Sequence, residues 1–351
     1  MKQTRLLFPG RRPALVALQS RLRGKSYDGA RFFILLDENT YTHCLPRLIG
    51  AVPALEEADF FEVPTGEEAK QPEIAWQLWR SLSECDADRR AVLLCLGGGC
   101  VSDIGGFVAS TYRRGLRTIC VPTTLVGMVD AAIGGKTALD LDGIKNVVGT
   151  FHMPDLVCID PAFLDTLPAD ELRAGLCEML KTLALCDADR YHALLAAVTA
   201  ADVTLQDEDL VRCAQFKQAV AAADPHDLGI RKMLNLGHTF GHALESHAAQ
   251  QGRPLSHGDA VGIGMDLAFY LSVRKLGFPE AEWNTFRTAL SALRPLPHFS
   301  LKDTESVLSF MRHDKKNEAQ QIRCVLMKEV GVPVVDVPVD ENEVRDALLH
   351  L

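Results

Sequence analysis

Three ionisable side chains carry the strongest indication of chemistry in this sequence: Glu178, His238 and His257. Two imidazoles and one carboxylate suit a single divalent cation, and they leave one coordination position for water or substrate. A structural zinc site, by contrast, fills its coordination shell with four protein ligands. The sequence therefore predicts a catalytic metal site.

Each of these residues also has an ordinary structural interpretation. His238 and His242 stand four residues apart, which places them on one face of a helix without any metal. His257 could begin a helix and have no ligand role. Glu178 is harder to explain in this way, because it lies in an apolar run and a buried carboxylate is costly unless paired or metal-bound. Thr239 replaces the general base of an H-E-x-x-H metalloprotease, which excludes that kind of peptide hydrolysis.

A glycine-rich turn at Gly97–Gly99 follows an apolar run and precedes a helical pattern. In this arrangement backbone amides and a helix N-terminus bind a pyrophosphate. Ser102 stands where the dinucleotide-binding fingerprint has its third glycine, so the turn by itself fits a tight turn as well as a cofactor site. The segment 130–137 resembles a P-loop, but Asp130 replaces the first glycine and excludes that motif.

Cationic residues recur along the chain, at Arg113, Arg114, Lys136, Lys145, Lys181, Lys217, Arg231, Lys315 and Lys316. Lys and Arg side chains directed at one cleft bind phosphate and carboxylate groups. Solvated surface charge explains most of them singly. It explains Lys136 and Lys145 less well, because their neighbours are apolar or form tight turns.

The elements that position these residues change in character along the chain. Buried strands are predicted at 31–36, 91–96, 118–121 and 156–159, with an amphipathic helix at 73–85. Helical patterns at 169–185, 207–223 and 258–277 follow, with strand signals only near 322–327 and 333–337. We expect an N-terminal Rossmann-like parallel α/β domain (residues 1–160) and a mainly helical metal-binding domain (161–351). The active site is expected in the cleft between them.

Composition limits the classes of partner. The 351 residues, 47% of them apolar, suffice for two cores, and the net charge of -9 argues against nucleic acid or an anionic membrane. No apolar run is long enough to span a bilayer. Ten cysteines, many in or beside apolar runs, predict reduced core thiols in a cytoplasmic protein. Cys177 is expected to pack beside Glu178 and not to act as a fourth ligand.

Spaced polar residues form a pattern that extends nearly from end to end. Its segments are Asp37-Glu-Asn39, Gly66-Glu67-x-x-Lys70, Gly97-Gly-Gly-x-x-x-Asp103, Tyr112-x-Arg114-Gly115, Pro122-Thr-Thr124, Asp130-x5-Lys136, Gly143-x-Lys145-Asn146, Glu178-x-x-Lys181, Lys217, Arg231-x3-Asn235-x-x-His238-x3-His242, His257-Gly258 and Asp314-Lys-Lys316. This pattern closely resembles that of the 3-dehydroquinate synthases, a family of sugar phosphate cyclases.

The resemblance implies a role for each matching residue. Glu178, His238 and His257 match metal ligands, usually for zinc or cobalt. The positions around NAD are matched by Asp37, Asn39, Glu67, Lys70, Gly98, Gly99, Asp103, Thr123, Thr124, Lys136, Lys145 and Thr166. The substrate phosphate site is matched by Lys136, Asn146, Asn235, His242 and Lys315 or Lys316, with Arg114 from the other subunit of a homodimer. Lys217 and Arg231 match the groups on the substrate carboxylate, and Asp130, Lys145 and Lys181 complete the pocket.

The family's reaction, as the resemblance implies it, turns 3-deoxy-D-arabino-heptulosonate 7-phosphate into 3-dehydroquinate and phosphate. Its steps are transient oxidation by NAD, phosphate elimination, reduction and intramolecular aldol closure. Arg231 favours a carboxylate-bearing substrate over the neutral sugar phosphates of sister cyclases, because an unpaired buried guanidinium is destabilising. A metal- and NAD-dependent polyol dehydrogenase and a catalytically silent NAD-binding protein are the remaining alternatives. Cys100, Ser102 and Asp259 depart from the family pattern.

Overall fold

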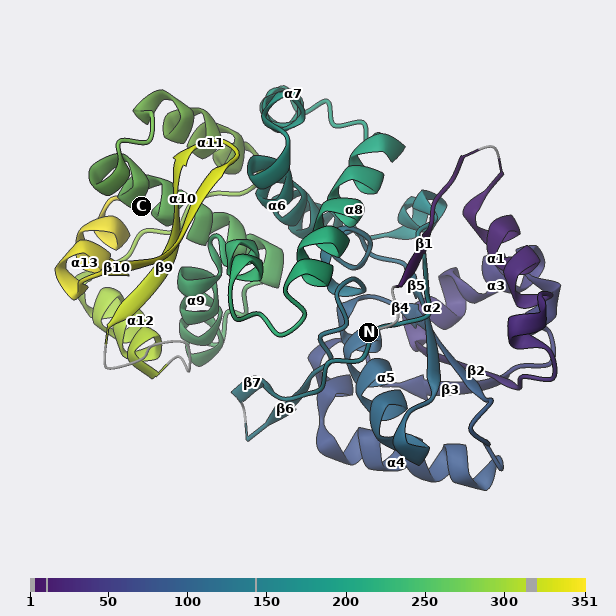
Figure 1. Cartoon of the computed structure of the whole chain (residues 1–351). Coiled ribbons are helices and arrows are strands. Elements are labelled where there is room, and N and C mark those ends of the chain that lie inside the picture. Colours follow the sequence, from purple (N-terminus) through teal and green to yellow (C-terminus); the bar gives the residue numbers. More distant parts are fainter. Residues whose placement is uncertain (1–3, 11, 143, 314–320) are drawn as a thin grey trace. The chain divides into compact units, whose positions relative to one another are not determined.

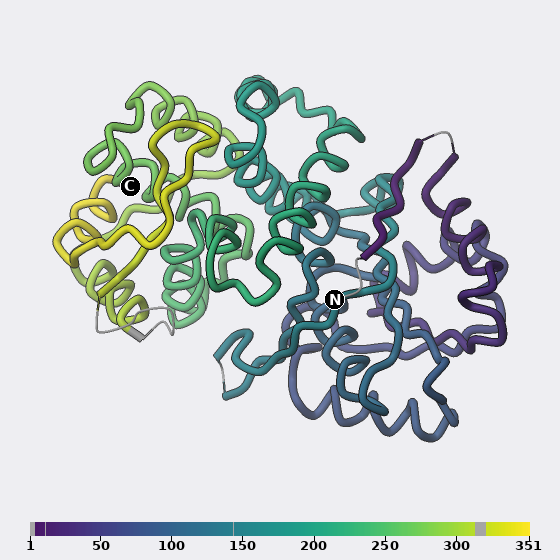
Figure 2. Tube along the Cα trace, in the orientation of Figure 1, coloured from purple at the N-terminus to yellow at the C-terminus, as the bar shows by residue number. Residues whose placement is uncertain are grey.

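The computed structural model describes residues 4–10, 12–142, 144–313 and 321–351, and the chain forms two compact units. The first unit takes Met1–Leu172 and Leu210–His226, and the second takes Arg173–Asp209 and Asp227–Leu351. Figure 1 labels the elements, and Figure 2 follows the chain through both units. The predicted boundary at residue 160 lies inside the first unit, to which a later helix also belongs.

The first unit contains a six-stranded parallel sheet with the strand order β1-β8-β5-β4-β2-β3. Its strands are β1 (Arg5–Leu7), β2 (Phe32–Asp37), β3 (Asp59–Val63), β4 (Val92–Gly97), β5 (Arg117–Pro122) and β8 (Leu156–Cys158). The strands predicted from apolar runs are β2, β4, β5 and β8, and the predicted Rossmann-like sheet is confirmed.

Burial explains which strands the sequence revealed. Every residue of β4 is buried, as is typical of a parallel strand covered on both faces. The sequence pattern missed β3, an edge strand in which half-buried and exposed residues alternate before the buried Val63, and β1, which has only three residues. Neither forms the continuous apolar run that marks a fully buried strand.

Helices and short turns complete the first unit. The α-helices are α1 (Ala14–Leu22), α2 (Glu38–His43), α3 (Leu45–Ala51), α4 (Pro72–Glu84), α5 (Gly99–Thr111) and most of α8 (Asp207–Ala223). The 3-10 turns are η1 (Lys25–Tyr27), η2 (Pro53–Leu55), η3 (Gly66–Lys70), η4 (Tyr112–Arg114) and η6 (Pro161–Thr166), and a π turn, η5, spans Gly127–Ala131. Strands β6 (Leu139–Leu141) and β7 (Ile144–Val148) form a small antiparallel pair. The predicted helices at 73–85 and 207–223 are α4 and α8.

The second unit is mainly helical, as predicted. It contains α6 (Ala169–Cys186) from Arg173 onward, α7 (Ala188–Thr199), α9 (His238–Gln250), α10 (His257–Leu276), α11 (Glu280–Leu293), α12 (Leu301–His313) and α13 (Glu341–Leu349). A 3-10 turn, η7 (Ile230–Asn235), precedes α9. The strand signals near 322–327 and 333–337 correspond to the antiparallel hairpin of β9 (Ile322–Glu329) and β10 (Val332–Val339). Helix α10 is buried over most of its length.

The ten cysteines, all within the described residues, form no disulfide, and most of them are buried. Burial raises the pKa of Cys100 to about 12, which keeps that thiol protonated. Within the described ranges, no helix combines the length and the apolar character that crossing a bilayer requires.

Candidate metal centre and cofactor site

Glu178 lies at the middle of α6 and is completely buried. Lys181, one helical turn later, is 1% exposed, and its Nζ lies 2.5 Å from Glu178 Oε2. A buried carboxylate is tolerated when such a partner offsets the loss of hydration. Lys181, a predicted pocket residue, is therefore part of the same charged centre as the predicted metal ligand.

Helix α9 begins at His238 because Gly237 turns the backbone immediately before it. Gly237 has φ +78°, and a Cβ there would lie 2.7 Å from the carbonyl oxygen of Val261. Only glycine fits this combination of left-handed backbone and close approach. The turn leaves His238 buried, with its Nδ1 3.2 Å from the carbonyl oxygen of Leu236.

His257 opens α10, whose N-terminus is capped by Ser256 accepting from the backbone N–H of Asp259 at 3.2 Å. A Cβ on Gly258 would lie 2.0 Å from the carbonyl oxygen of Ala174 on α6. One turn later, a Cβ on Gly262 would lie 2.8 Å from Cys177 Sγ. These glycines let α10 pack directly against α6, which brings His257 to Glu178.

Cys177 lies at this helix crossing, and Asp259 supports the start of α10. Cys177 is 1% exposed, as expected for a small packing residue. The carboxylate of Asp259, one of the departures from the family pattern, pairs with Arg173 at 3.3 Å and with Arg294 at 2.9 Å. Two guanidinium groups therefore hold the first turn of the helix that carries His257.

The three predicted ligands converge. His238 Nε2 lies 3.7 Å and His257 Nε2 lies 3.4 Å from Glu178 Oε1, and the three donor atoms all lie within 4.8 Å of one another. Ligand atoms about 2.1 Å from a tetrahedral zinc ion are roughly 3.4 Å apart, so the donor set fits such an ion.

Electrostatics agree with this fit. Burial lowers the pKa of His257, but hydrogen bonds to Glu178 and Glu245 outweigh burial and raise the pKa to about 10. The carboxylates thus create a strongly negative local field that stabilises positive charge at this position. A divalent cation has the charge that such a field favours.

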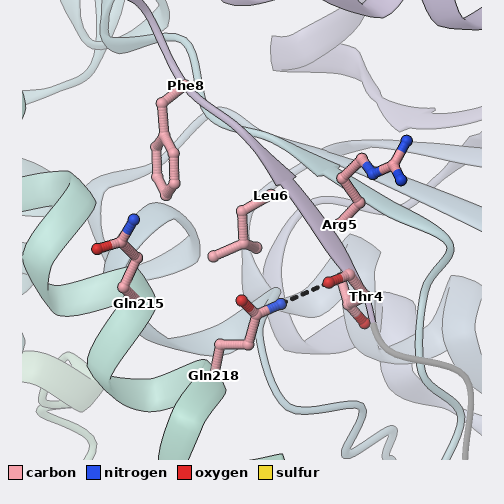
Figure 3. A pocket seen from close by; sticks show the side chains of 6 residues that line it. All are labelled: Thr4, Arg5, Leu6, Phe8, Gln215 and Gln218. Atoms are coloured by element: carbon pink, nitrogen blue, oxygen red, sulfur yellow. Dashed lines mark hydrogen bonds between the residues drawn. The ribbon is translucent and has the colours of Figure 1, made fainter.

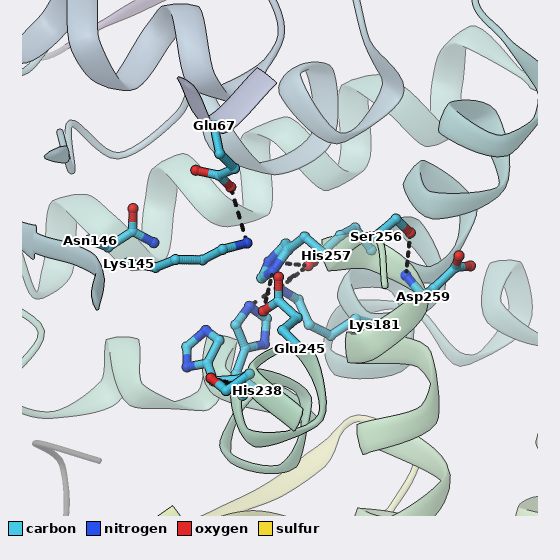
Figure 4. A network of polar contacts seen from close by, with 12 residues as sticks. Glu67, Lys145, Asn146, Lys181, His238, Glu245, Ser256, His257 and Asp259 are labelled. Atoms are coloured by element: carbon cyan, nitrogen blue, oxygen red, sulfur yellow. Dashed lines mark hydrogen bonds and ion pairs between the residues drawn. The ribbon is translucent and has the colours of Figure 1, made fainter. Parts of the chain in front are cut away.

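Other predicted substrate residues of this unit lie on α9 or just before it. His242 follows His238 by one turn, and their ring centroids are 5.5 Å apart. Arg231 and Asn235 belong to η7, and Arg231 is among the most deeply buried large side chains, with 2% exposure. Figure 4 shows Lys181, His238 and His257 beside Glu245, a residue that the sequence patterns did not single out. Lys315 and Lys316 lie outside the described residues.

In the first unit, the Gly97–Gly99 turn connects β4 to α5. A Cβ on Gly98 would lie 3.0 Å from the Thr124 side chain, and Thr123 donates its N–H to the Gly97 carbonyl at 3.1 Å. The predicted NAD residues Gly98, Gly99, Thr123 and Thr124 are therefore neighbours at the carboxyl ends of β4 and β5. Ligands of open parallel sheets bind at this edge.

Close packing of α5 resolves the departure at Ser102. A Cβ on Gly105 would lie 2.3 Å from Cys95 Sγ on β4, so this glycine lets the helix lie directly on the strand. That is the task of the third glycine in the dinucleotide fingerprint. Ser102 instead donates from Oγ to the carbonyl oxygen of Gly98 at 3.1 Å, which ties the helix back to the turn.

Lys70 gathers several of the predicted residues around one ammonium group. It is 3% exposed, and its Nζ lies 3.1 Å from Asp103, 3.4 Å from Glu67 and 3.8 Å from Asp140, and also contacts the side-chain oxygen of Asn146. Burial lowers the pKa of Lys70, but Asp103 and Glu67 outweigh that effect and raise it. For the carboxyl group of Asp103, burial has the opposite effect: it raises the pKa to about 6, although the positive charge of Lys70 acts to lower it.

Asp140 was not predicted, yet it shapes the turn that carries Asn146. Its Oδ1 accepts the backbone N–H of Asn146 at 2.7 Å, where the Asn146 backbone is left-handed with φ +54°. Beside it, Lys145 Nζ lies 3.3 Å from Glu67 Oε1 (Figure 4). Asp140 could have been noticed only as an acidic residue close to a predicted turn.

The remaining predicted residues lie on several different elements. Lys217 on α8 pairs with Asp130, its Nζ lying 2.7 Å from Oδ1, while Lys136 forms a single antiparallel bridge with Phe151. Asp37 caps α2 by accepting the Thr40 N–H at 2.8 Å, and Asn39 lies in that helix. Arg114 and Thr166 are exposed. Lys217 and Arg231, the two predicted carboxylate-binding residues, belong to different units.

A separate hollow of about 480 Å³ lies in the first unit beside β1 and α8 (Figure 3). It is lined by Thr4, Arg5, Leu6, Phe8, Gln215 and Gln218. Gln218 donates from Nε2 to the carbonyl oxygen of Thr4 at 2.6 Å, which joins α8 to the edge strand. None of the predicted site residues that the structure describes lines this hollow, so it is not the candidate site.

The chain is similar to known proteins both in sequence and in fold. The model of the 3-dehydroquinate synthase N-terminal domain matches residues 60–174, and that of the C-terminal domain matches residues 175–317. A 3-dehydroquinate synthase of Parabacteroides distasonis is 36% identical over 334 residues, which cover 95% of this chain and 93% of the relative.

Two solved structures share the fold. The 2-epi-5-epi-valiolone synthase ValA of Streptomyces hygroscopicus, with NAD+ and Zn2+ bound, is 27% identical, with a TM-score of 0.84 and coverage of 99% of this chain and 96% of that chain. A 2-deoxy-scyllo-inosose synthase, complexed with carbaglucose-6-phosphate, NAD+ and Co2+, is 24% identical, with a TM-score of 0.82 and the same coverage.

Proposed function

The chain belongs to the 3-dehydroquinate synthase family, and from this premise we propose that it converts 3-deoxy-D-arabino-heptulosonate 7-phosphate into 3-dehydroquinate and phosphate. The observation that carries the proposal is the convergence of Glu178, His238 and His257 on one another inside the matched C-terminal region. A phosphate-eliminating lyase of this family needs a metal centre with one position left for substrate.

Glu178, His238 and His257 would hold one divalent metal, zinc or cobalt, and the residues around Gly98 and Gly99 would hold NAD. When bound, the metal supplies Lewis acidity to substrate hydroxyl groups, and NAD supplies a hydride acceptor that is regenerated within each turnover. Lys181 offsets the charge of Glu178 and holds its carboxylate in place. The NAD residues proposed are Asp37, Asn39, Glu67, Lys70, Gly98, Gly99, Asp103, Thr123, Thr124, Lys136, Lys145 and Thr166.

The substrate would be a small phosphorylated, carboxylate-bearing sugar acid. We assign its phosphate to Lys136, Asn146, Asn235, His242 and Lys315 or Lys316, with Arg114 from the second subunit of a homodimer. Arg231 and Lys217 would bind its carboxylate, and Asp130, Lys145 and Lys181 would complete the pocket. Charge-assisted hydrogen bonds from such groups stabilise the negative charge that develops as phosphate leaves.

The side-chain type of Arg231 supports a carboxylate-bearing substrate over the neutral sugar phosphates of sister cyclases. A guanidinium offers two parallel hydrogen bonds that match the two oxygens of a carboxylate, and a neutral sugar has no such group. A polyol dehydrogenase, another of the alternatives, has no need of groups that stabilise a leaving phosphate.

The proposal is tested by following phosphate release from 3-deoxy-D-arabino-heptulosonate 7-phosphate with a catalytic amount of NAD. We expect one phosphate per 3-dehydroquinate, no net NADH, and loss of activity with a chelator that added zinc or cobalt restores. Sedoheptulose 7-phosphate serves as the control substrate that lacks the carboxylate. NADH that accumulates in step with product would indicate a dehydrogenase instead, and faster use of the control substrate would indicate a sister cyclase.

A further inference from the structure

The two ring nitrogens of His257 face two different carboxylates. Nε2 lies 3.4 Å from Glu178 Oε1, and Nδ1 lies 3.4 Å from Glu245 Oε2, within hydrogen-bonding range. Glu245 is on α9, two turns after His238, and is 6% exposed. We propose that Glu245 is a positioning residue that fixes the tautomer and orientation of His257, so that Nε2 faces the metal. This inference rests on the metal site of the proposed function.

The neighbouring ligand shows the same arrangement with a different acceptor. Nδ1 of His238 lies 3.2 Å from the carbonyl oxygen of Leu236, and its Nε2 faces Glu178. A carbonyl oxygen only accepts, so a hydrogen bond there places the proton on Nδ1 and leaves the Nε2 lone pair for a metal. The ionised carboxylate of Glu245 also only accepts, and it imposes the same tautomer on His257. The backbone thus orients one imidazole, and Glu245 orients the other.

Glu245 could instead be a ligand of a second ion, because donor atoms of His242, Glu245 and His257 also lie within 4.8 Å of one another. His257 would then give Nε2 to one ion and Nδ1 to the other. An imidazole can bind two ions only after it loses its last N–H proton. With a single ion on Nε2, the ring keeps the proton on Nδ1, donates it to Glu245 in a hydrogen bond, and stays neutral. This difference favours a single ion bound by His257, with Glu245 accepting the hydrogen bond from Nδ1 of that ligand.

Substitution of Glu245 tests the inference through metal binding, independently of activity. Metal-free protein is titrated with Co2+ in competition with a chelator of known affinity, and the visible absorption of the bound Co2+ is recorded. We expect Glu245→Ala to weaken Co2+ binding about 10- to 100-fold and to change the absorption bands, because His257 is no longer held. Glu245→Gln keeps the shape but loses the charge, and its amide can also donate to the ring, so we expect an intermediate loss.

Asp266→Asn is the matched control. Asp266 lies on α10 with His257 and is 1% exposed, but its carboxylate accepts from Trp283 Nε1 at 2.8 Å and pairs with Arg287 at 3.4 Å. This variant should keep the Co2+ affinity and spectrum of the unsubstituted protein. Melting temperatures of the metal-free proteins show whether either change acts through stability.

Three outcomes would overturn the inference. One is unchanged Co2+ affinity and spectrum in both Glu245 variants. Another is two Co2+ per chain in the unsubstituted protein and one in Glu245→Ala, which would make Glu245 a ligand. The third is a loss of Co2+ affinity in both the Glu245 and the Asp266 variants that is proportional to the fall in melting temperature of each. Failure of the unsubstituted protein to bind Co2+ would contradict the proposed function itself.

Discussion

At the scale of single residues, Arg231 is where the choice of substrate should be visible. The residue is 2% exposed, and a buried cation is retained only when charge and hydrogen bonds compensate it. Lysine at this position would keep the charge but lose the planar pair of donors that matches a carboxylate. We expect Arg231→Lys to raise KM for the carboxylate-bearing substrate by roughly 10- to 100-fold, the size of one lost charged hydrogen bond. The affinity for NAD should stay unchanged in a direct titration.

Arg274→Lys is the control for that substitution, because Arg274 is 54% exposed and pairs with Asp346 at the surface. It should leave both KM and the NAD affinity as they are. A parallel loss of NAD affinity in Arg231→Lys would point to a folding defect and contradict a specific role on the carboxylate.

Sequence reasoning at this scale singled out Glu178, His238 and His257 from residue type and spacing, and the fold brings their donor atoms together. Their role as metal ligands stays a prediction. Sequence reasoning missed Glu245 and Asp140, because their roles depend on contacts that the fold creates. Glu245 left one usable signal: it follows His238 by seven residues, which places both on one face of a helix. For Asp140, whose partners are the backbone N–H of Asn146 and the ammonium group of Lys70, residue type and spacing give no comparable signal.

At the scale of elements, the glycines of α10 decide how the ligand-bearing helices approach one another. A Cβ on Gly258 would lie 2.0 Å from the carbonyl oxygen of Ala174, and one on Gly264 would lie 2.0 Å from that of Gly237. Backbone atoms cannot move aside as a side chain can. The sequence showed Gly258 as part of a motif, and the structure supplies the reason: α6 occupies the space of its missing side chain.

Gly258→Ala should therefore push α10 away from α6 and separate His257 from Glu178. We expect a loss of stability of about 1 to 3 kcal/mol, typical of an overpacked core, together with at least a tenfold weaker Co2+ affinity. Urea unfolding and the competitive Co2+ titration measure the two effects.

Gly50→Ala is the matched control, since Gly50 lies on α3 and a Cβ there would meet no atom within 4 Å. It should be neutral or stabilise the protein by about 0.5 to 1 kcal/mol, with unchanged Co2+ affinity. If Gly258→Ala bound Co2+ as tightly as Gly50→Ala does, the proposed dependence of the metal site on this helix crossing would be wrong.

At the scale of the whole molecule, each of the two units is built from two separate segments of the chain. Most of α8 returns to the first unit after the chain has built α6 and α7. Lys217 pairs with Asp130 there, Gln218 donates to Thr4, and the apolar residues Leu210, Cys213, Ala214, Val220 and Ala221 are buried. Local periodicity predicted α8 as a helix but could not assign it to a unit, because that depends on packing between residues far apart in the chain.

A division of the chain at residue 160 or 172 should therefore give an incomplete first unit. A fragment of residues 1–172 lacks α8, so it should unfold at lower urea concentration and with less cooperativity than the same fragment joined to residues 207–226 by a flexible linker. Trp76 and Trp79 lie in this unit, and their fluorescence reports its unfolding. A linked fragment carrying Lys217→Ala, Gln218→Ala and Ala214→Asp serves as the control, because it has the same length but cannot dock α8. If the three fragments unfolded alike, the first unit would be complete without α8, and the simpler division of the chain would hold.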